Sequence, residues 1–319
     1  MQLGITLSTY ATDGWRMPAS RLVDCAQSIE EAGFAGIWIS EHLTRPPGRE
    51  YSWLAPLTTA ATVVGATESI PVGTSIAVMP LRNPVHVAHQ VASLQHLSEE
   101  RFTLGLGAGY VHDDYAALGV PYAERGPRFS EGLSLLMALL SEESVTFDGR
   151  FYSVSSFSLE PRPARRPRVL VGGGGVDGED GRAVPDPVID RIAMADGWIA
   201  APRRPGILGQ DWAEIASALE TAGRDPTAID RLAMNWAYLV PGVEADLAWE
   251  KQRAVIDGKD DPETARDHYL TGSIEDIQER LAWYEREGYD HVLLGPITPD
   301  PAMFERQIEY YVDYLDAFL

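Results

Sequence analysis

Short apolar runs alternate with longer segments of helical periodicity along the whole chain. The runs predict eight strands, at Leu3–Thr6, Gly36–Ile39, Pro71–Ala77, Phe102–Gly107, Arg168–Gly172, Gly197–Ile199, Leu232–Val240 and His291–Leu294. The longer segments predict helices at Ser20–Ala32, Pro56–Ala66, Pro84–Leu97, Pro127–Leu140, Pro187–Ala195, Leu208–Ala222, Ser273–Glu287 and Pro301–Leu319. Strict alternation of strand and helix indicates the α/β class and a closed parallel (β/α)8 TIM barrel rather than an open sheet.

Three segments interrupt this alternation and are interpreted as insertions after strands 4, 5 and 7. Thr146–Phe157 holds Asp148 and Gly149 between two aromatic runs, which is a hairpin signal. Val176–Pro187 and Gly242–Gly272 are acidic and rich in turn residues, and both follow strand ends, where loops cover sites. We therefore expect one barrel domain over residues 1–319 with candidate lids.

Composition narrows the classes of partner. The chain has 47 acidic and 26 basic residues, a formal charge of −21, which disfavours nucleic acid and anionic membranes as partners. A single cysteine, Cys25, excludes an intramolecular disulfide. The first residues lack the pattern of a secretion signal and no long apolar segment occurs, so a cytoplasmic location is expected.

The first candidate for chemistry is the pair Glu41 and His42, directly after the second strand. Active sites of barrel enzymes lie at the carboxyl ends of the strands, and an imidazole there can give or take a proton. Neighbours on an extended segment point to opposite faces, so the two side chains need not touch. The alternative is that both residues only bond loop backbone at the rim.

A second candidate is the run Gly105–Tyr110 at the end of the fourth strand. It does not fit a dinucleotide fingerprint, because the third glycine would fall at Tyr110 and no helix begins there. Gly107, Ala108 and Gly109 leave the backbone bare, so a flat ring or a chain could lie against it. A tight bend without a ligand explains the same residues.

The third candidate is the four-glycine run Gly172–Gly175 after the fifth strand. Its unhindered N–H groups suit a nest for a phosphate or carboxylate, and a flexible hinge is the alternative. Gly173, Gly175 and Gly178 match a dinucleotide pattern literally, but the prolines that follow are incompatible with the helix that such a site needs.

Histidines and tryptophans give weaker signals. His86, His89 and His96 share a helix without a carboxylate beside them, so no metal site is predicted. Trp15, Trp53, Trp198 and Trp236 are candidates for an apolar pocket or for core positions.

Seven motifs in order resemble the bacterial luciferase-like monooxygenase superfamily. They are GFAGIWISEH, VGTSIAVMPLRNP, RFTLGLGAGYVHDDYAALGVPYAERG, FDGRFYSV, PRPARRPRVLVGGGG, ADGW and LTGSIEDIQERLAWYEREGYDHVLL. The resemblance extends from Leu3 to about Leu294. It implies a (β/α)8 barrel that binds FMN or the deazaflavin coenzyme F420 at the carboxyl ends of the strands.

The resemblance also implies site residues. His42 matches the histidine that faces the reactive part of the ring, and Glu41 matches its acidic neighbour. Ser75 and Ile76 match a pair joined by a non-prolyl cis peptide bond, a bulge against the back of the ring. The implied coenzyme contacts also include, for the ring edge and ribityl chain, Gly107, Ala108, Gly109 and Tyr110, and, for the phosphate, Gly172, Gly173, Gly174 and Gly175.

This chain departs from the family pattern after the glycine run. Most relatives enter a helix almost directly, whereas this chain inserts Val176–Pro187. The insertion carries carboxylates at Asp177, Glu179 and Asp180, and its one basic residue is Arg182. Carboxylates near a phosphate are unfavourable unless the insertion swings away or Arg182 pairs with the anion. Tyr110 also stands where many relatives have Trp.

The expected function is an oxidoreductase with a flavin-type coenzyme, F420 or FMN, and a small organic substrate. The run from GAGY to FDGRFYSV favours F420 and hydride transfer. The acidic charge disfavours the oligoglutamate tail of F420, so an oxygen-using monooxygenase with reduced FMN, supplied by a separate reductase, stays open. Two less favoured hypotheses are a non-catalytic flavin-binding barrel and an unrelated enzyme of phosphorylated sugars. Relatives are often homodimers, so a homodimer is expected.

Overall fold

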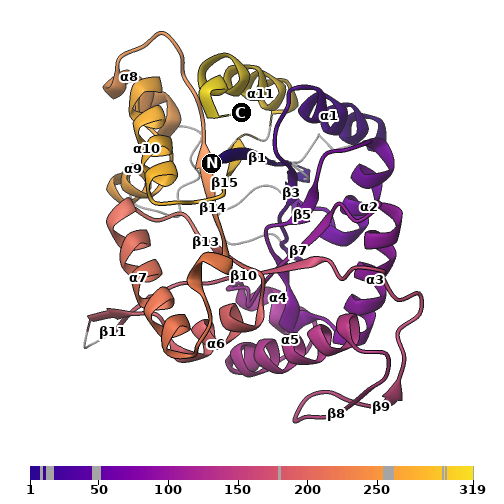
Figure 1. Ribbon diagram of the computed structural model, residues 1–319. Coiled ribbons are helices and arrows are strands. Elements are labelled where there is room, and N and C mark those ends of the chain that lie inside the picture. The colour runs from indigo at the N-terminus through magenta and orange to yellow at the C-terminus, as the bar shows by residue number, and fades with distance from the viewer. Residues whose placement is uncertain are drawn as a thin grey trace.

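Eight parallel strands close a barrel, which confirms the predicted fold class (Figure 1). The computed structural model describes residues 1–7, 10–11, 18–44, 52–178, 181–253, 262–296, 298 and 300–318. The barrel strands are β1 (Gln2–Thr6), β3 (Ile37–Ile39), β5 (Val72–Thr74), β7 (Phe102–Gly107), β10 (Arg168–Gly172), β13 (Gly197–Ala200), β14 (Asp230–Ala237) and β15 (His291–Pro296). They follow this order around the barrel, and β15 pairs with β1 to close it.

Helices surround the strands in Figure 1. They are α1 (Ala19–Glu31), α2 (Pro56–Ala66), α3 (Pro84–Leu97), α4 (His112–Ala117), α5 (Arg125–Ser141), α6 (Asp186–Met194), α7 (Pro205–Thr221), α8 (Ala245–Arg253), α9 (Pro262–His268), α10 (Ile274–Arg286) and α11 (Pro301–Leu315). The apolar stripe of α1 packs on the barrel, as the burial of Leu22, Cys25 and Ile29 shows. No helix in the described part of the chain is long and apolar enough to cross a membrane.

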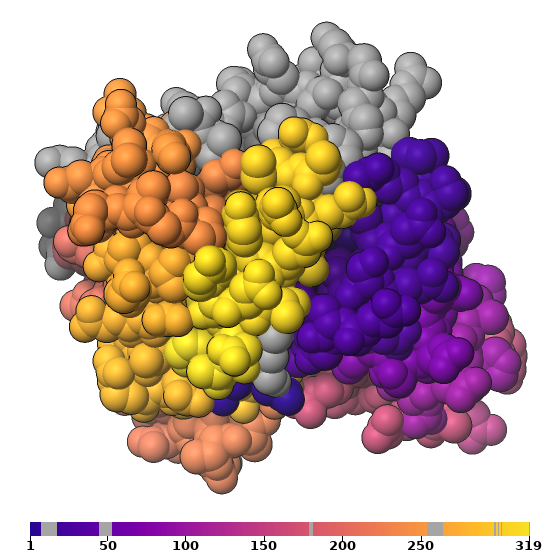
Figure 2. All heavy atoms as spheres, turned by 90° about the horizontal axis from the view of Figure 1, so that it is seen from above, coloured from indigo at the N-terminus to yellow at the C-terminus, as the bar shows by residue number. Residues whose placement is uncertain are grey.

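The two halves of the chain also meet on the surface. Figure 2 shows the C-terminal helix α11 beside the N-terminal segment. An ion pair of 2.6 Å between Arg21 of α1 and Glu305 of α11 joins them. The outer ring of helices therefore continues across the seam where β15 meets β1.

The barrel interior is packed around Trp38, which is 6% exposed. Leu170, Ile199, Leu232 and Leu293 form a buried cluster with this indole. A Cβ atom on Gly73 would lie 2.5 Å from Cζ3 of Trp38, so glycine on the neighbouring strand makes room for the ring. The interior is a filled core below the carboxyl ends of the strands.

Local sequence signals place most element boundaries. Asn83 caps α3 through the Val85 amide, and Ser273 forms a capping box with Asp276 at the start of α10. The third predicted strand is wrong in its length. It ends at Thr74, the Ser75–Ile76 peptide bond is cis, and a short strand β6 (Ala77–Val78) follows.

The insertions have structure of their own. The predicted hairpin is present as β8 (Val145–Asp148) and β9 (Ser153–Phe157). A second hairpin, β11 (Val176–Gly178) with β12 (Gly181–Ala183), was not predicted. The third insertion contains α8 and α9. The expectations for Trp15, Glu179 and Asp180 lie outside the described residues.

Candidate functional site

His42 lies at the carboxyl end of β3, half-buried between two aromatic side chains. Its ring centroid is 4.5 Å from that of Trp53, with the planes at 66°, and 5.6 Å from that of Tyr110, with the planes at 83°. Trp53 belongs to the short strand β4 (Ser52–Trp53), which pairs with β2 (Tyr10–Ala11). The structure thus brings together His42 and Tyr110, two predicted site residues, and adds Trp53 beside them.

Alternation along the strand explains which way His42 faces. Trp38 belongs to the interior cluster, whereas Ile37 and Ile39 belong to the core between strands and helices. Continuing this alternation places Ser40 and His42 on the interior side and Glu41 on the outer side. The imidazole therefore belongs to the barrel mouth.

The carboxylate of Glu41 faces a different partner. Nη1 of Arg82 donates to Oε2 over 2.7 Å, Nη2 of Arg82 donates to Oε1, and the Val78 amide donates to Oε2 over 2.7 Å. The side chain of Glu41 is 6% exposed. Both of its oxygens are therefore occupied, an arrangement that suits holding the backbone rather than exchanging a proton.

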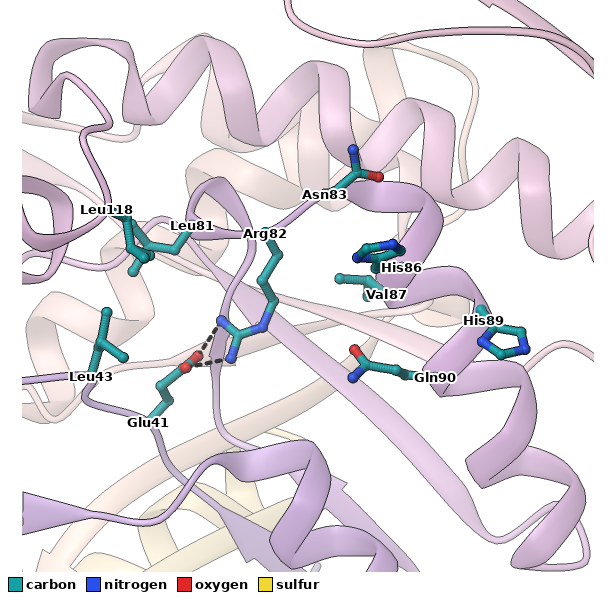
Figure 3. A pocket seen from close by; sticks show the side chains of 10 residues that line it. All are labelled: Glu41, Leu43, Leu81, Arg82, Asn83, His86, Val87, His89, Gln90 and Leu118. Atoms are coloured by element: carbon teal, nitrogen blue, oxygen red, sulfur yellow. Dashed lines mark hydrogen bonds and ion pairs between the residues drawn. The ribbon is translucent and has the colours of Figure 1, made fainter.

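Glu41 and Arg82 also form one wall of a pocket outside the barrel (Figure 3). The pocket has a volume of about 530 Å³. Its other lining residues are Leu43, Leu81, Asn83, His86, Val87, His89, Gln90 and Leu118. It lies against the start of α3 and not at the mouth beside His42.

The Ser75–Ile76 bulge joins its neighbours through hydrogen bonds. The Ser75 amide donates to the carbonyl of Ile39 over 2.9 Å, and Ser40 Oγ donates to the carbonyl of Ser75 over 3.0 Å. The bulge therefore lies directly beside the segment that carries His42.

Ile76 packs across two of the predicted glycines. A Cβ on Gly107 would lie 2.7 Å from Ile76 Cδ1, and a Cβ on Gly172 would lie 3.1 Å from Ile76 Cγ2. Glycine at both positions therefore makes room for Ile76 itself. Among the next residues, Gly109 has φ +69° and the carbonyl of Ala108 accepts a hydrogen bond from the Tyr115 hydroxyl.

Two buried polar atoms at the strand ends test whether a ring-shaped coenzyme fits. Thr6 Oγ1 and Ser75 Oγ are buried and have no hydrogen-bond partner among the described residues. Buried hydroxyl groups of this kind normally find a partner. These two hydroxyls leave hydrogen-bonding capacity unused at the ring end of the expected site, which is compatible with a polar ligand there.

The phosphate end does not fit in the same way. The Gly175 amide donates over 3.0 Å to Oδ2 of Asp211, a buried carboxylate on α7. Nε and Nη2 of Arg182 each donate to Asp211 over 2.9 Å. These hydrogen bonds raise the pKa of the Arg182 guanidinium above its usual value. The predicted nest already holds a carboxylate of the same chain.

Neighbouring contacts hold this arrangement in place. Nε1 of Trp198 donates to the carbonyl of Gly173 over 2.7 Å, and Trp212 of α7 stacks on Trp198 with centroids 5.8 Å apart. Trp198 is fully buried and so belongs to the core rather than to a pocket.

Arg82 and Asp211 are the residues that the sequence reasoning missed. Asp211 had a usable signal, because it stands with Leu208, Ile215 and Leu219 on the buried face of α7. A carboxylate in an apolar stripe requires a buried partner. His86, His89 and His96 are exposed, and no group of three or more His, Cys, Asp or Glu in the described ranges could hold a metal.

Comparison with known proteins agrees with this architecture. The model of the luciferase-like monooxygenase family matches residues 1–295. The F420-dependent hydroxymycolic acid dehydrogenase of Mycobacterium tuberculosis is 32% identical over 245 residues, 76% of this chain and 65% of that protein. The chain therefore spans less than two thirds of that relative's length.

Two solved structures share the fold at low identity. An F420-dependent secondary alcohol dehydrogenase in complex with an F420-acetone adduct superposes with a TM-score of 0.83, at 18% identity over 100% of this chain and 99% of that chain. The monooxygenase RslO1 from Streptomyces bottropensis superposes with a TM-score of 0.79, at 19% identity over 99% and 98%. Fold and site together define a (β/α)8 barrel with a histidine at its mouth. The chain belongs to the luciferase-like monooxygenase family.

Proposed function

We propose that the chain is an oxidoreductase that uses coenzyme F420 to transfer a hydride to or from a small organic substrate. The observation that carries the proposal is the position of His42 at the barrel mouth, beside the Ser75–Ile76 bulge and between Trp53 and Tyr110. The name of the mycobacterial relative supports the choice of coenzyme. When bound, F420 supplies a ring carbon that accepts or donates a hydride.

In this proposal His42 moves the proton that accompanies the hydride. Oxidation of an alcohol to a carbonyl removes a hydride from carbon and a proton from oxygen, and the imidazole takes that proton. Trp53 and Tyr110 pack edge-to-face with the imidazole and hold its plane. Glu41, held by Arg82 and Val78, is a positioning residue that keeps the end of β3 against the bulge.

The same geometry supports a set of proposed ring contacts. His42, Ser75 and Ile76 face the ring, and Gly107, Ala108, Gly109 and Tyr110 line its edge and the adjoining chain. The four-glycine run is proposed as the segment nearest the phosphate, although Gly174 and Gly175 face the carboxylate of Asp211.

A second candidate is a monooxygenase that uses FMN, reduced by a separate reductase. The charge of −21 favours it, because a strongly acidic protein repels the oligoglutamate tail of F420. Titration of the purified protein with oxidised and reduced F420 and FMN, followed by fluorescence, tests both candidates. Tight binding of reduced F420 supports hydride transfer, tight binding of FMN alone supports the monooxygenase, and binding of neither overturns both.

We also propose that residues 1–319 form one domain and that the protein is a homodimer. Neither α2 nor α3 contains Asp, Glu, Lys or Arg, whereas every other described α-helix contains at least two. Two copies with a charge of −21 each repel one another least across this uncharged face.

A cytoplasmic location is consistent with the single cysteine, Cys25, which is buried and free.

A further inference from the structure

The last two glycines of the four-glycine run lie against a buried carboxylate and the groups that bind it. A Cβ on Gly174 would lie 2.9 Å from Oδ2 of Asp211, and a Cβ on Gly175 would lie 2.6 Å from Oδ1 of Asp211. The glycines therefore let the backbone approach a negatively charged group closely. That group is Asp211, whose side chain is 4% exposed.

The carboxylate is fully bonded where it lies. It accepts from the Gly175 amide and, through both oxygens, from Arg182. Arg182 belongs to β12, and its side chain is 13% exposed. Its remaining contact is with Asp177 of β11, 3.4 Å away and 86% exposed. Asp211 is thus the main counter-ion of Arg182.

The same face of α7 fixes the hairpin at a second point. The Val184 amide donates to Glu214 over 2.9 Å, one turn along α7 from Asp211. The hairpin β11–β12 is therefore anchored to α7 by two carboxylates, and Asp211 joins the hairpin, the glycine run and the helix.

We propose that Asp211 is the resident anion of the four-glycine run and a specificity-determining residue. Together with Arg182 it closes Gly174 and Gly175 to the phosphate group of a coenzyme. The inference rests on the proposed function for the coenzyme itself. A phosphate entering this run would have to displace a buried carboxylate from three hydrogen-bond donors, or be buried beside it as a second negative charge.

FMN and riboflavin make the first test, because they share the ring and differ in the phosphate. We expect the wild-type protein to bind the two with dissociation constants within about threefold of each other. In Asp211→Ala the three donors lose their carboxylate. The affinity for FMN should then exceed that for riboflavin by about tenfold or more, the scale of a charge-assisted hydrogen bond. Asp211→Asn, which removes the charge but keeps the volume, should move the ratio in the same direction.

Asp196→Ala is the matched control. Asp196 accepts from both terminal nitrogens of Arg166, over 2.5 Å and 2.7 Å, and from the Val169 amide over 2.8 Å, at the opposite end of β10. The Asp196→Ala variant loses an ion pair of the same kind, but far from the glycine run. Its ratio of dissociation constants for FMN and riboflavin should therefore equal that of the wild type. A tenfold preference for FMN in the wild type, or an unchanged ratio in both Asp211 variants, overturns the proposal.

Inorganic phosphate supplies a readout that needs no flavin. At about 20 mM phosphate, against sodium chloride of equal ionic strength, the Tm of Asp211→Ala should rise by about 3 °C and that of the wild type should not change. An equal rise in Asp196→Ala would mean that any unpaired arginine binds phosphate, and overturns the proposal. If no flavin binds, the proposed function fails, and the phosphate measurement still decides the role of Asp211.

Discussion

Glu41 and Arg82, 41 positions apart in the chain, form a two-point ion pair at the end of β3. Through the Val78 amide the same carboxylate reaches the segment that follows the Ser75–Ile76 bulge. Two stretches of chain that both border the barrel mouth are thus held together on its outer side. The pair acts on the site through the backbone.

We expect Glu41→Gln and Arg82→Gln to lower the free energy of unfolding by about 3 kcal/mol each, because either change leaves a largely buried charge without its partner. The double variant should lose much less free energy of unfolding than the sum of the two single losses. Urea unfolding and a double-mutant cycle would measure the difference. Additive losses would contradict a coupled pair.

His42→Ala tests the proton-transfer role. Turnover should fall by about 100-fold or more, while coenzyme affinity stays within about tenfold, because the ring keeps its other contacts. His96→Ala, an exposed histidine on α3, is the control and should leave both quantities unchanged. Equal turnover in His42→Ala and the wild type would rule out His42 as the acid or base.

Glu30 predicts a pH dependence of stability. Burial acts to raise the pKa of this carboxyl, but hydrogen bonds from the amides of Ser69, Ile70 and Glu68 outweigh it and lower the pKa to about 2. A depressed pKa in the folded state adds stability above the unfolded pKa, and this is lost as pH falls toward 2.

The variant Glu30→Gln should therefore have a lower Tm than the wild type at pH 7, and the difference should shrink as pH falls below about 5. Thermal melts between pH 7 and pH 3 measure it. Its exposed neighbour, changed as Glu31→Gln, should show no such trend. A Tm difference that is independent of pH would contradict the assignment.

Gly107→Ala tests the space that Ile76 needs. The added methyl would stand 2.7 Å from Ile76 Cδ1, so the bulge must shift, and both stability and coenzyme affinity should fall. In Gly209→Ala on α7, the new methyl meets nothing within 4 Å, so the variant should gain about 0.5–1 kcal/mol. Unchanged coenzyme binding in Gly107→Ala would remove Ile76 from the site.

If the uncharged face of α2 and α3 is the dimer interface, a charge placed on it should change the mass of the protein in solution. Light scattering should give twice 35.0 kDa for the wild type and 35.0 kDa for Ala61→Arg, which puts a charge on the exposed side of α2. Ala213→Arg, on the exposed side of α7, should stay a dimer. Dissociation by both variants, or by neither, would place the interface elsewhere.

Much of the barrel could be predicted because its signals are local. Proline after Asn83 starts α3, and Ser273 with Asp276 starts α10, in both cases by hydrogen bonds within one turn. The position of His42 followed from the rule that barrel sites lie at strand ends.

Long-range contacts explain what the sequence reasoning missed. Asp211 meets Arg182 across 29 positions and only because the insertion folds into a hairpin, whereas the turn residues of this insertion were interpreted as those of a candidate lid. Glu41 was expected to do chemistry, and its bonds to Arg82 depend on where the chain turns after the bulge. Such pairings are set by tertiary packing and not by spacing.

The position of Trp38 determines from which side a ligand can approach His42. Because this indole and its apolar neighbours fill the barrel interior, the described residues leave the carboxyl ends of the strands as the side from which a molecule approaches His42. In the proposed function, coenzyme and substrate share this side of the barrel, so the one that binds deeper leaves after the other.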